Sequence, residues 1–249
     1  MKIKKPEVDY LKFRFSKIND PQYKHLWLLL GWVWYLTMYV LTENLIPAER
    51  CHEVHSVVDD LIPFNANFIL AYCSWYFLLV GSILYFMLYD VQSFVRLQKF
   101  IIATQVIGIA TCILWPSIQY LRPAEPTGNA FCVFLVKCIY GVDTPTGVCP
   151  SLHVGYSMAI LSAWLKRRQS KPWWKAVVTV WVLLISISVC FVKQHSFTDV
   201  WAACVMCALI EAVLFWKYWK EKIVHLRMFS QQKGKKEWLE DGAIEETES

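Results

Sequence analysis

Six long apolar runs are the feature that most limits what this chain can fold into. Each is long enough, or nearly so, to cross the hydrocarbon core of a bilayer as a helix. Hydrophobic residues make up 56% of the chain and charged residues only 18%, whereas soluble domains carry roughly a quarter charged residues. The sequence therefore predicts an all-α polytopic membrane protein, a six-transmembrane helical bundle. The expected spans are residues 26–41, 68–88, 100–114, 153–165, 174–192 and 197–216.

The distribution of Lys and Arg predicts which side of the membrane each loop occupies. Seven of these residues lie in residues 1–25, five in 166–175, two in 90–99 and four at the start of the C-terminal tail. The alternate loops hold only Arg50, Arg122, Lys137 and Lys193. Because basic residues concentrate in cytoplasmic loops, we expect both termini in the cytoplasm. We also expect the protein to lie in the cell membrane.

The polar segments complete the expected domain organisation. Residues 1–25 form a basic cytoplasmic arm, 26–216 the six-span membrane domain, and 217–249 a polar cytoplasmic tail. The end of that tail is acidic and of low complexity, which is typical of disorder. The apolar stretch 131–140 is too short to span a membrane, so it predicts an interfacial or re-entrant helix.

Two short segments at the expected outer ends of apolar runs each carry a histidine. The first is Val148–Val154, with His153, and the second is Lys193–Asp199, with His195. A titratable imidazole beside an apolar run is costly unless it is used or satisfied. The fourth and fifth spans form a hairpin, which returns the chain to the same membrane face, so we expect the two histidines to meet there. The spacing from His195 to Asp199 is one helical turn, which favours contact between them.

These residue types suit the transfer of a phosphoryl group. A carboxylate beside an imidazole fixes its tautomer and stabilises the imidazolium, which makes His195 an oriented nucleophile or base. His153 supplies a complementary acid. Arg122 and Lys193 are expected on the same face and bring positive charge to a group whose transition state spreads negative charge over several oxygens.

Three ordered blocks resemble the signature of the type 2 phosphatidic acid phosphatase superfamily. They are Arg122-Pro123, Pro150-Ser151-Leu152-His153 and His195-x-x-x-Asp199. The resemblance implies a membrane domain, 26–216, that is catalytic and needs no metal or other cofactor. It implies that His195 is the nucleophile that forms a phosphohistidine, Asp199 its partner and His153 the general acid. Arg122 and Ser151 would bind phosphate oxygens.

The blocks depart from the family pattern at three positions. Trp115 stands where a lysine is usual, Leu152 where a glycine is usual and Val189 where an arginine is usual. Lys193 is our candidate to replace part of the lost charge, although an ammonium does not reproduce the fork of a guanidinium. The reduced blocks resemble the branch with inositol phosphorylceramide synthases and sphingomyelin synthases, besides bacterial lipid phosphatases.

We therefore predict an integral membrane lipid phosphatase that hydrolyses a lipid phosphomonoester or pyrophosphate on the extracytoplasmic face. One alternative is a phosphotransferase that moves a phospho-headgroup to a lipid alcohol. Another is a non-catalytic membrane protein with a degenerate site. The expected partners are the bilayer and a lipid phosphate substrate, with no nucleic acid, and the oligomeric state stays open.

Several residues invite other interpretations. Cys149 is not a tyrosine-phosphatase nucleophile, because Gly155 stands where that loop needs an arginine. The segment Cys51–His55 holds potential metal ligands, but its spacing fits no strong zinc pattern. Ser151 can cap a helix as well as bind phosphate, since a helix N-terminus attracts anions. A disulfide stays open among the cysteines expected outside, which are Cys51, Cys132, Cys138 and Cys149.

Overall fold

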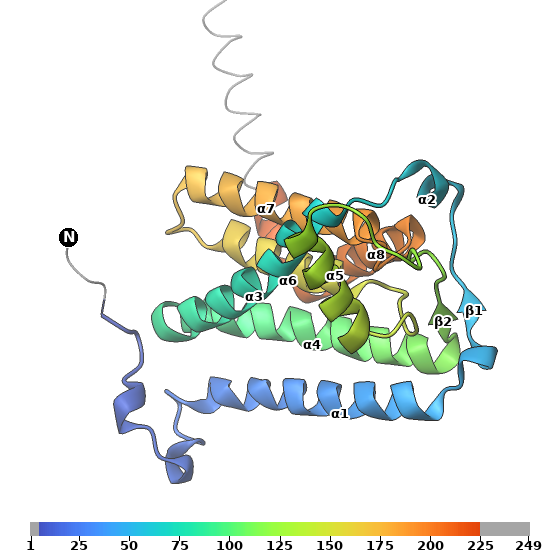
Figure 1. Cartoon of the computed structure of the whole chain (residues 1–249). Helices are drawn as coiled ribbons and strands as arrows, with labels where there is room; N and C mark the ends of the chain where they lie inside the picture. Colours follow the sequence, from blue (N-terminus) through green and yellow to red (C-terminus); the bar gives the residue numbers. More distant parts are fainter. Residues whose placement is uncertain (1–4, 225–249) are drawn as a thin grey trace, which may run out of the picture. The chain divides into compact units, whose positions relative to one another are not determined.

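The computed structural model describes residues 5–224, which are predominantly helical (Figure 1). The chain divides into two units, Met1–Ala208 and Leu209–Ser249, and every residue discussed below as part of a site belongs to the first. The long helices are α1 (Leu30–Leu45), α3 (Ile69–Tyr89), α4 (Val91–Leu114), α6 (Leu152–Lys166), α7 (Pro172–Phe191) and α8 (Phe197–Leu214). The short helices are α2 (Val57–Leu61) and α5 (Ala130–Val142). Single 3₁₀ turns occupy Tyr10–Lys12, Phe15–Lys17, Lys24–Leu29, Ala48–Arg50 and Ala66–Phe68.

Five of the six predicted spans are helices long and apolar enough to cross a membrane, which makes this a membrane protein. They are Lys24–Leu45, Ala66–Tyr89, Val91–Leu114, Pro172–Phe191 and Phe197–Leu214. The fourth predicted span is helix α6, whose 15 residues extend only about 22 Å. The count of six spans therefore stays a prediction. The stretch 131–140 is helical as expected, within the 13 residues of α5.

The link expected at 90–99 is wrong, because α4 begins directly after Asp90. The Asp90 carboxylate accepts a hydrogen bond from the Ser93 amide at 3.0 Å, which caps the new helix. Phe94 and Leu97 lie on the buried face of this first part of α4. The basic residues in 90–99, which were predicted to lie in a loop, are therefore side chains of α4, which begins before the apolar run.

Helix α6 lies among α3, α4 and α7 and contacts all three. Its start lies close to α4, since a Cβ on Gly108 would lie only 2.9 Å from a methyl group of Leu152. Helix α1 runs along α4 (Figure 1). The N-terminal arm contacts the C-terminal end of α3, where the Glu7 amide donates to the Leu88 carbonyl at 2.8 Å. Contacts with α4 thus fix the end of α6 that carries His153.

A two-stranded parallel sheet joins two loops at the histidine end. Strand β1 (His52–Glu53) pairs with β2 (Ser117–Ile118), with His52 opposite Ser117. The buried Ser117 hydroxyl accepts a hydrogen bond from the Cys149 amide at 3.0 Å. This contact anchors the loop that leads into α6.

Two other predictions concern the cysteines and the tail. All nine cysteines lie within the described residues and are free thiols, so the disulfide left open above is absent from this structure. The predicted disordered end of the tail lies outside the described residues.

Candidate functional site

His195 lies in the turn between α7 and α8, not on a helix as the spacing suggested. It is 7% exposed. The next residue, Ser196, begins a capping box: its hydroxyl accepts from the Thr198 amide at 3.1 Å, and the Asp199 carboxylate accepts from the Ser196 amide at 2.9 Å. This reciprocal capping fixes Asp199 in the first turn of α8. The carboxylate is therefore held beside the turn that carries His195.

His153 lies in the first turn of α6, whose N-cap is Ser151. The Ser151 hydroxyl accepts from the Val154 amide at 3.4 Å. The Ser151 amide donates to the backbone carbonyl of Asp199 at 3.1 Å. The starts of α6 and α8 are therefore joined directly through their main chains.

The two predicted segments meet at their imidazole rings. Nδ1 of His153 lies 3.3 Å from Nε2 of His195. On the other side of the His195 ring, Nδ1 lies 3.4 Å from an oxygen of Asp199, an ion-pair distance without the alignment of a hydrogen bond. Asp199 is fully buried. The structure thus arranges His153, His195 and Asp199 in a row.

A second row of polar groups continues from His153, and the sequence did not predict its members Tyr72 and Gln194. Nε2 of His153 lies 2.8 Å from the hydroxyl of Tyr72 on α3. The Gln194 amide donates to that hydroxyl at 3.4 Å and to the Asp143 carboxylate at 3.0 Å. Trp75 packs against the His153 ring with centroids 4.7 Å apart. The ring of His153 is therefore fixed on both of its nitrogens.

Asp59 of α2 holds the turn that carries His195. Its carboxylate, 3% exposed, accepts from the Ser196 hydroxyl at 2.5 Å and from the Phe197 amide at 2.7 Å. It also accepts from the Ser56 amide at 2.8 Å, within a capping box of α2. A negative charge at the start of α8 also interacts favourably with the positive end of the helix dipole. The Ser56-x-x-Asp59 spacing was the only local signal for this residue.

Lys193 points away from the histidine rings in this structure. Its backbone is left-handed, with φ of 53°. Its ammonium donates to the carbonyls of Asp59 at 2.8 Å and Ile62 at 2.5 Å. It therefore ties the α2 loop to the turn before α8, and its contact with phosphate stays a prediction.

Arg122 is likewise engaged by the backbone. Its two terminal nitrogens donate to the carbonyls of Asp143 at 2.8 Å and Thr144 at 3.1 Å, and the guanidinium lies 4.6 Å from the centroid of the Tyr140 ring. Burial lowers the pKa of Arg122, and the nearby Asp143 carboxylate opposes that shift. Arg122 thus supports the loop that presents Asp143 to Gln194.

The residues at the three positions that depart from the expected pattern pack against, or bond to, neighbouring parts of the protein. Val189 is fully buried, and its carbonyl accepts from the amides of Gln194 and His195. Trp115 stacks on His52 with ring centroids 5.3 Å apart. Leu152 fills the space above Gly108. Neither Trp115 nor Val189 supplies the positive charge of the usual lysine and arginine.

The described residues also bear on two other kinds of chemistry, a cysteine nucleophile at Cys149 and a metal site. Burial, and to a lesser degree Asp199, raises the pKa of the Cys149 thiol to about 12, so it stays protonated rather than becoming a nucleophile. Among residues 5–224, no cluster of three His, Cys, Asp or Glu side chains is arranged to hold a metal ion.

A comparison with family models identifies the family of this chain. Residues 99–223 match the model of the PAP2 superfamily. The chain belongs to the PAP2 superfamily. The match includes Arg122, Ser151, His153, Lys193, His195 and Asp199, but Asp59 and Tyr72 lie before it. No curated protein and no solved structure matches the chain. Membership of the PAP2 superfamily fits a lipid phosphatase or a related phosphotransferase.

Proposed function

We propose that the protein is an integral membrane lipid phosphatase that acts through a phosphohistidine on His195, without a metal. The observation that carries the proposal is the row of Asp199, His195 and His153, with separations of 3.4 and 3.3 Å. Two imidazoles so close, one backed by a buried carboxylate, form a matched nucleophile and acid. The proposed substrates are lipid phosphomonoesters or pyrophosphates, such as phosphatidate, lysophosphatidate or an isoprenyl diphosphate.

The hydrogen bonds favour one set of proton positions. Because the Tyr72 hydroxyl accepts from Gln194, its own proton is directed to Nε2 of His153. The neutral ring of His153 then carries its proton on Nδ1, which faces His195. Asp199 favours the proton of His195 on Nδ1, which leaves the Nε2 lone pair free to attack.

The proposed reaction has two steps. Substrate binding as an anion brings one proton to His153, which becomes the imidazolium, and its Nε2–H then donates to the Tyr72 hydroxyl. Nε2 of His195 attacks phosphorus and forms an N–P bond, while the bond from phosphorus to the lipid oxygen breaks. That oxygen takes the Nδ1 proton of His153, which leaves His153 as a neutral ring with a free lone pair on Nδ1. His153 then removes a proton from water, whose oxygen attacks phosphorus and releases phosphate from His195. Asp199 stabilises the positive charge on His195 in the phosphorylated state.

Substrate entry must separate the two rings. In-line transfer places phosphorus about 3 Å from the attacking nitrogen, with the leaving oxygen beyond it and within a hydrogen bond of the acid. That chain of atoms does not fit into the 3.3 Å between the two nitrogens. Rotation of the His153 side chain away from His195 opens the required space.

The phosphate-binding groups in this proposal are Arg122, Ser151 and Lys193. Ser151 caps α6, whose N-terminal amides carry a partial positive charge that favours a phosphate oxygen. For Arg122 or Lys193 to help, each must exchange a backbone carbonyl for a phosphate oxygen. Charge-assisted bonds to phosphate are stronger than bonds to a neutral carbonyl, so the exchange is favourable.

We also propose that α6 is a sixth crossing and that both termini are cytoplasmic. Because α6 is short, we expect His153 to lie below the outer surface, in a recess of the membrane domain. Support comes from the sequence, in which Lys and Arg concentrate in residues 1–25 and 166–175 and are scarce in the loops that carry the two histidine segments.

The decisive experiment offers the purified full-length protein a panel of lipid phosphates in detergent with EDTA, with and without diacylglycerol or ceramide. We expect free phosphate from the wild type and none from His195→Ala. A new phospholipid that forms only when the alcohol is present would favour the phosphotransferase instead.

A second measurement detects the intermediate. Rapid quenching with a ³²P-labelled substrate should give a base-stable, acid-labile phosphoprotein whose label maps to His195. If no label appears, and His153→Ala and His195→Ala change no activity, the protein is not an enzyme of this kind.

A further inference from the structure

We propose that a groove at the membrane surface opposite the histidines binds an anionic phospholipid, with one acyl chain along the groove and the headgroup at Lys171. The groove lies between α3 and α7 and has a volume of about 500 Å³. Helix α6 connects the two regions, because His153 is in its first turn and Arg167 follows its last residue. The inference is independent of the proposed function.

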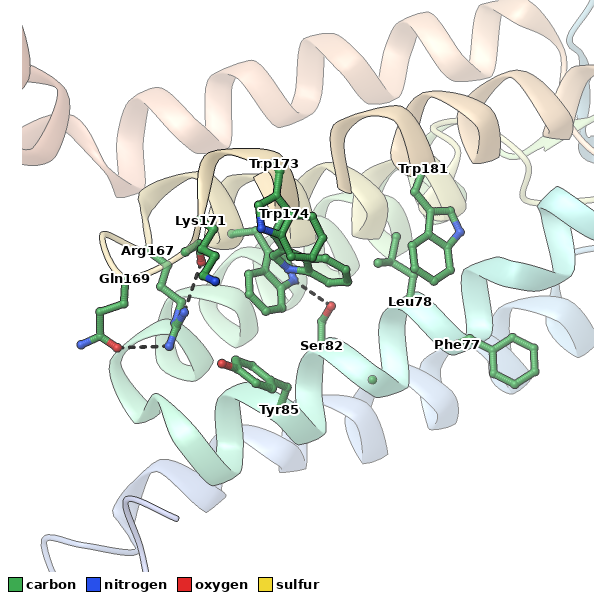
Figure 2. A pocket seen from close by; sticks show the side chains of 13 residues that line it. Phe77, Leu78, Ser82, Tyr85, Arg167, Gln169, Lys171, Trp173, Trp174 and Trp181 are labelled. Atoms are coloured by element: carbon green, nitrogen blue, oxygen red, sulfur yellow. Dashed lines mark hydrogen bonds between the residues drawn. The ribbon is translucent and has the colours of Figure 1, made fainter. Parts of the chain in front are cut away.

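The walls of the groove are apolar and aromatic (Figure 2). Trp173, Trp174 and Trp181 of α7 face Phe77 and Tyr85 of α3 across it. Two indoles of the lining are satisfied internally. The Trp164 indole donates to the Ser82 hydroxyl at 3.0 Å. The Trp181 indole donates to Ser74 at 2.7 Å. Such walls present mainly carbon surface to a ligand, which suits an acyl chain.

One end of the groove is cationic. Arg167, Gln169 and Lys171 lie together there, in the loop between α6 and α7 (Figure 2). Arg167 is buried and paired with Asp90 at 2.8 Å, so its charge is compensated within the protein. Lys171 is exposed. This end of the groove therefore offers the Lys171 ammonium to a ligand, next to the Arg167–Asp90 ion pair, whose charges cancel.

The two ends match the two parts of a phospholipid. Tryptophan belts and basic side chains mark the interface between the hydrocarbon and the headgroups, and basic pockets between membrane helices bind anionic headgroups. A zwitterionic lipid would gain less from Lys171, because its own cation opposes the attraction. Charge complementarity thus commits the site to an anionic lipid.

Gly81 keeps the groove open. It is exposed on α3 and lines the groove, and a Cβ built on it meets no atom within 4 Å. A large side chain at this position would extend into the space meant for the acyl chain without displacing a neighbour. Gly81→Phe is therefore a blocking variant, and Gly81→Ala is its control because it also replaces the glycine but adds only one carbon.

The test uses delipidated full-length protein in detergent, offered phosphatidylglycerol or phosphatidylcholine, with retained lipid counted by native mass spectrometry. All variants carry His195→Ala, so that turnover plays no part. We expect preferential retention of phosphatidylglycerol, which Gly81→Phe abolishes and Gly81→Ala preserves. Lys171→Gln should lower the preference about fivefold, the effect of one basic residue near a membrane surface.

A photoreactive phosphatidylglycerol with a diazirine in its acyl chain locates the site. We expect crosslinks to residues 77–85 and 173–181. Equal retention of the two lipids by the protein, unchanged retention in Gly81→Phe, or crosslinks confined to other helices would each overturn the proposal. If Gly81→Phe does not fold, Trp173→Ala, at a wall position that is 61% exposed, tests the same wall.

Discussion

The hydroxyl of Tyr72 lies 2.8 Å from Nε2 of His153, although 81 residues separate them in sequence. Tyr72 is 1% exposed, so its proton has few alternatives to this nitrogen. Through this contact α3 holds the ring of the proposed general acid.

Tyr72→Phe should lower kcat about fivefold with little change in KM, because it removes one hydrogen bond, worth about 1 kcal/mol, to a residue that acts in the transition state. Steady-state kinetics with the lipid phosphate that the panel assay selects provide the measurement. Tyr76→Phe, on an exposed position of the same helix, is the control. An unchanged kcat in Tyr72→Phe would remove Tyr72 from the site.

Asp59→Asn should lower both thermal stability and activity. The carboxylate accepts from the Ser196 hydroxyl and the Phe197 amide, and an amide in its place turns one acceptor into a donor. We expect a loss of about 2 kcal/mol in stability and reduced kcat even well below the melting temperature. Thermal unfolding and kinetics check the two parts.

Asp60→Asn is the matched control for this variant. Asp60 is adjacent in sequence, but its carboxylate pairs with His55 at 2.9 Å on the surface, where such pairs contribute little. Its melting temperature and activity should match those of the wild type. If the two variants behave alike, Asp59 does not hold the His195 turn.

Arg122→Lys should behave more like Arg122→Ala than like the wild type. The guanidinium reaches the carbonyls of Asp143 and Thr144 at once and lies over Tyr140, and an ammonium cannot reproduce that fork. Activity should fall in both variants. Full activity in Arg122→Lys would show that only the charge matters.

Cys149 should be chemically silent. Since burial raises its pKa to about 12, the thiolate form is scarce from pH 6 to 9, and N-ethylmaleimide should not modify it in the folded protein. Exposed Cys138 should react under the same conditions, as peptide mass spectrometry would show. Cys149→Ser should retain activity; rapid labelling of Cys149 below pH 9 would contradict its buried, protonated state.

The apolar runs predict most of the helices because a membrane helix must satisfy its own backbone and hide it behind apolar side chains. The start of α4 was not predicted because it lacks such a continuous run of apolar side chains. Residues 91–99 mix Gln, Arg and Lys with Phe94 and Leu97, so only one face is apolar and the run is not uniform. A helix that is buried on one side needs the tertiary structure to be recognised.

The sequence predicted only those site residues that belong to recognisable motifs in a fixed order along the chain. His153, His195 and Asp199 follow from spacing and from the reversal of direction between α6 and α7. Tyr72 contacts His153 across 81 residues, and Asp59 contacts Ser196, the neighbour of His195, across 137 residues. No sequence spacing predicts these long-range contacts. Lys193 was predicted to replace part of the lost charge; its ammonium contacts the carbonyls of Asp59 and Ile62 in this structure, and its contact with phosphate stays a prediction.

The position of Asp59 and Tyr72 ahead of residue 99 bears on how this protein can be exchanged with its relatives. A chimera that swaps only residues 99–223 transplants the histidines and Asp199 but leaves behind the carboxylate and the hydroxyl that orient them. Such a hybrid should insert and fold yet work poorly, until the donor's preceding loop and helix are moved with it. The exchangeable module therefore begins near residue 56, in the acidic loop before α3.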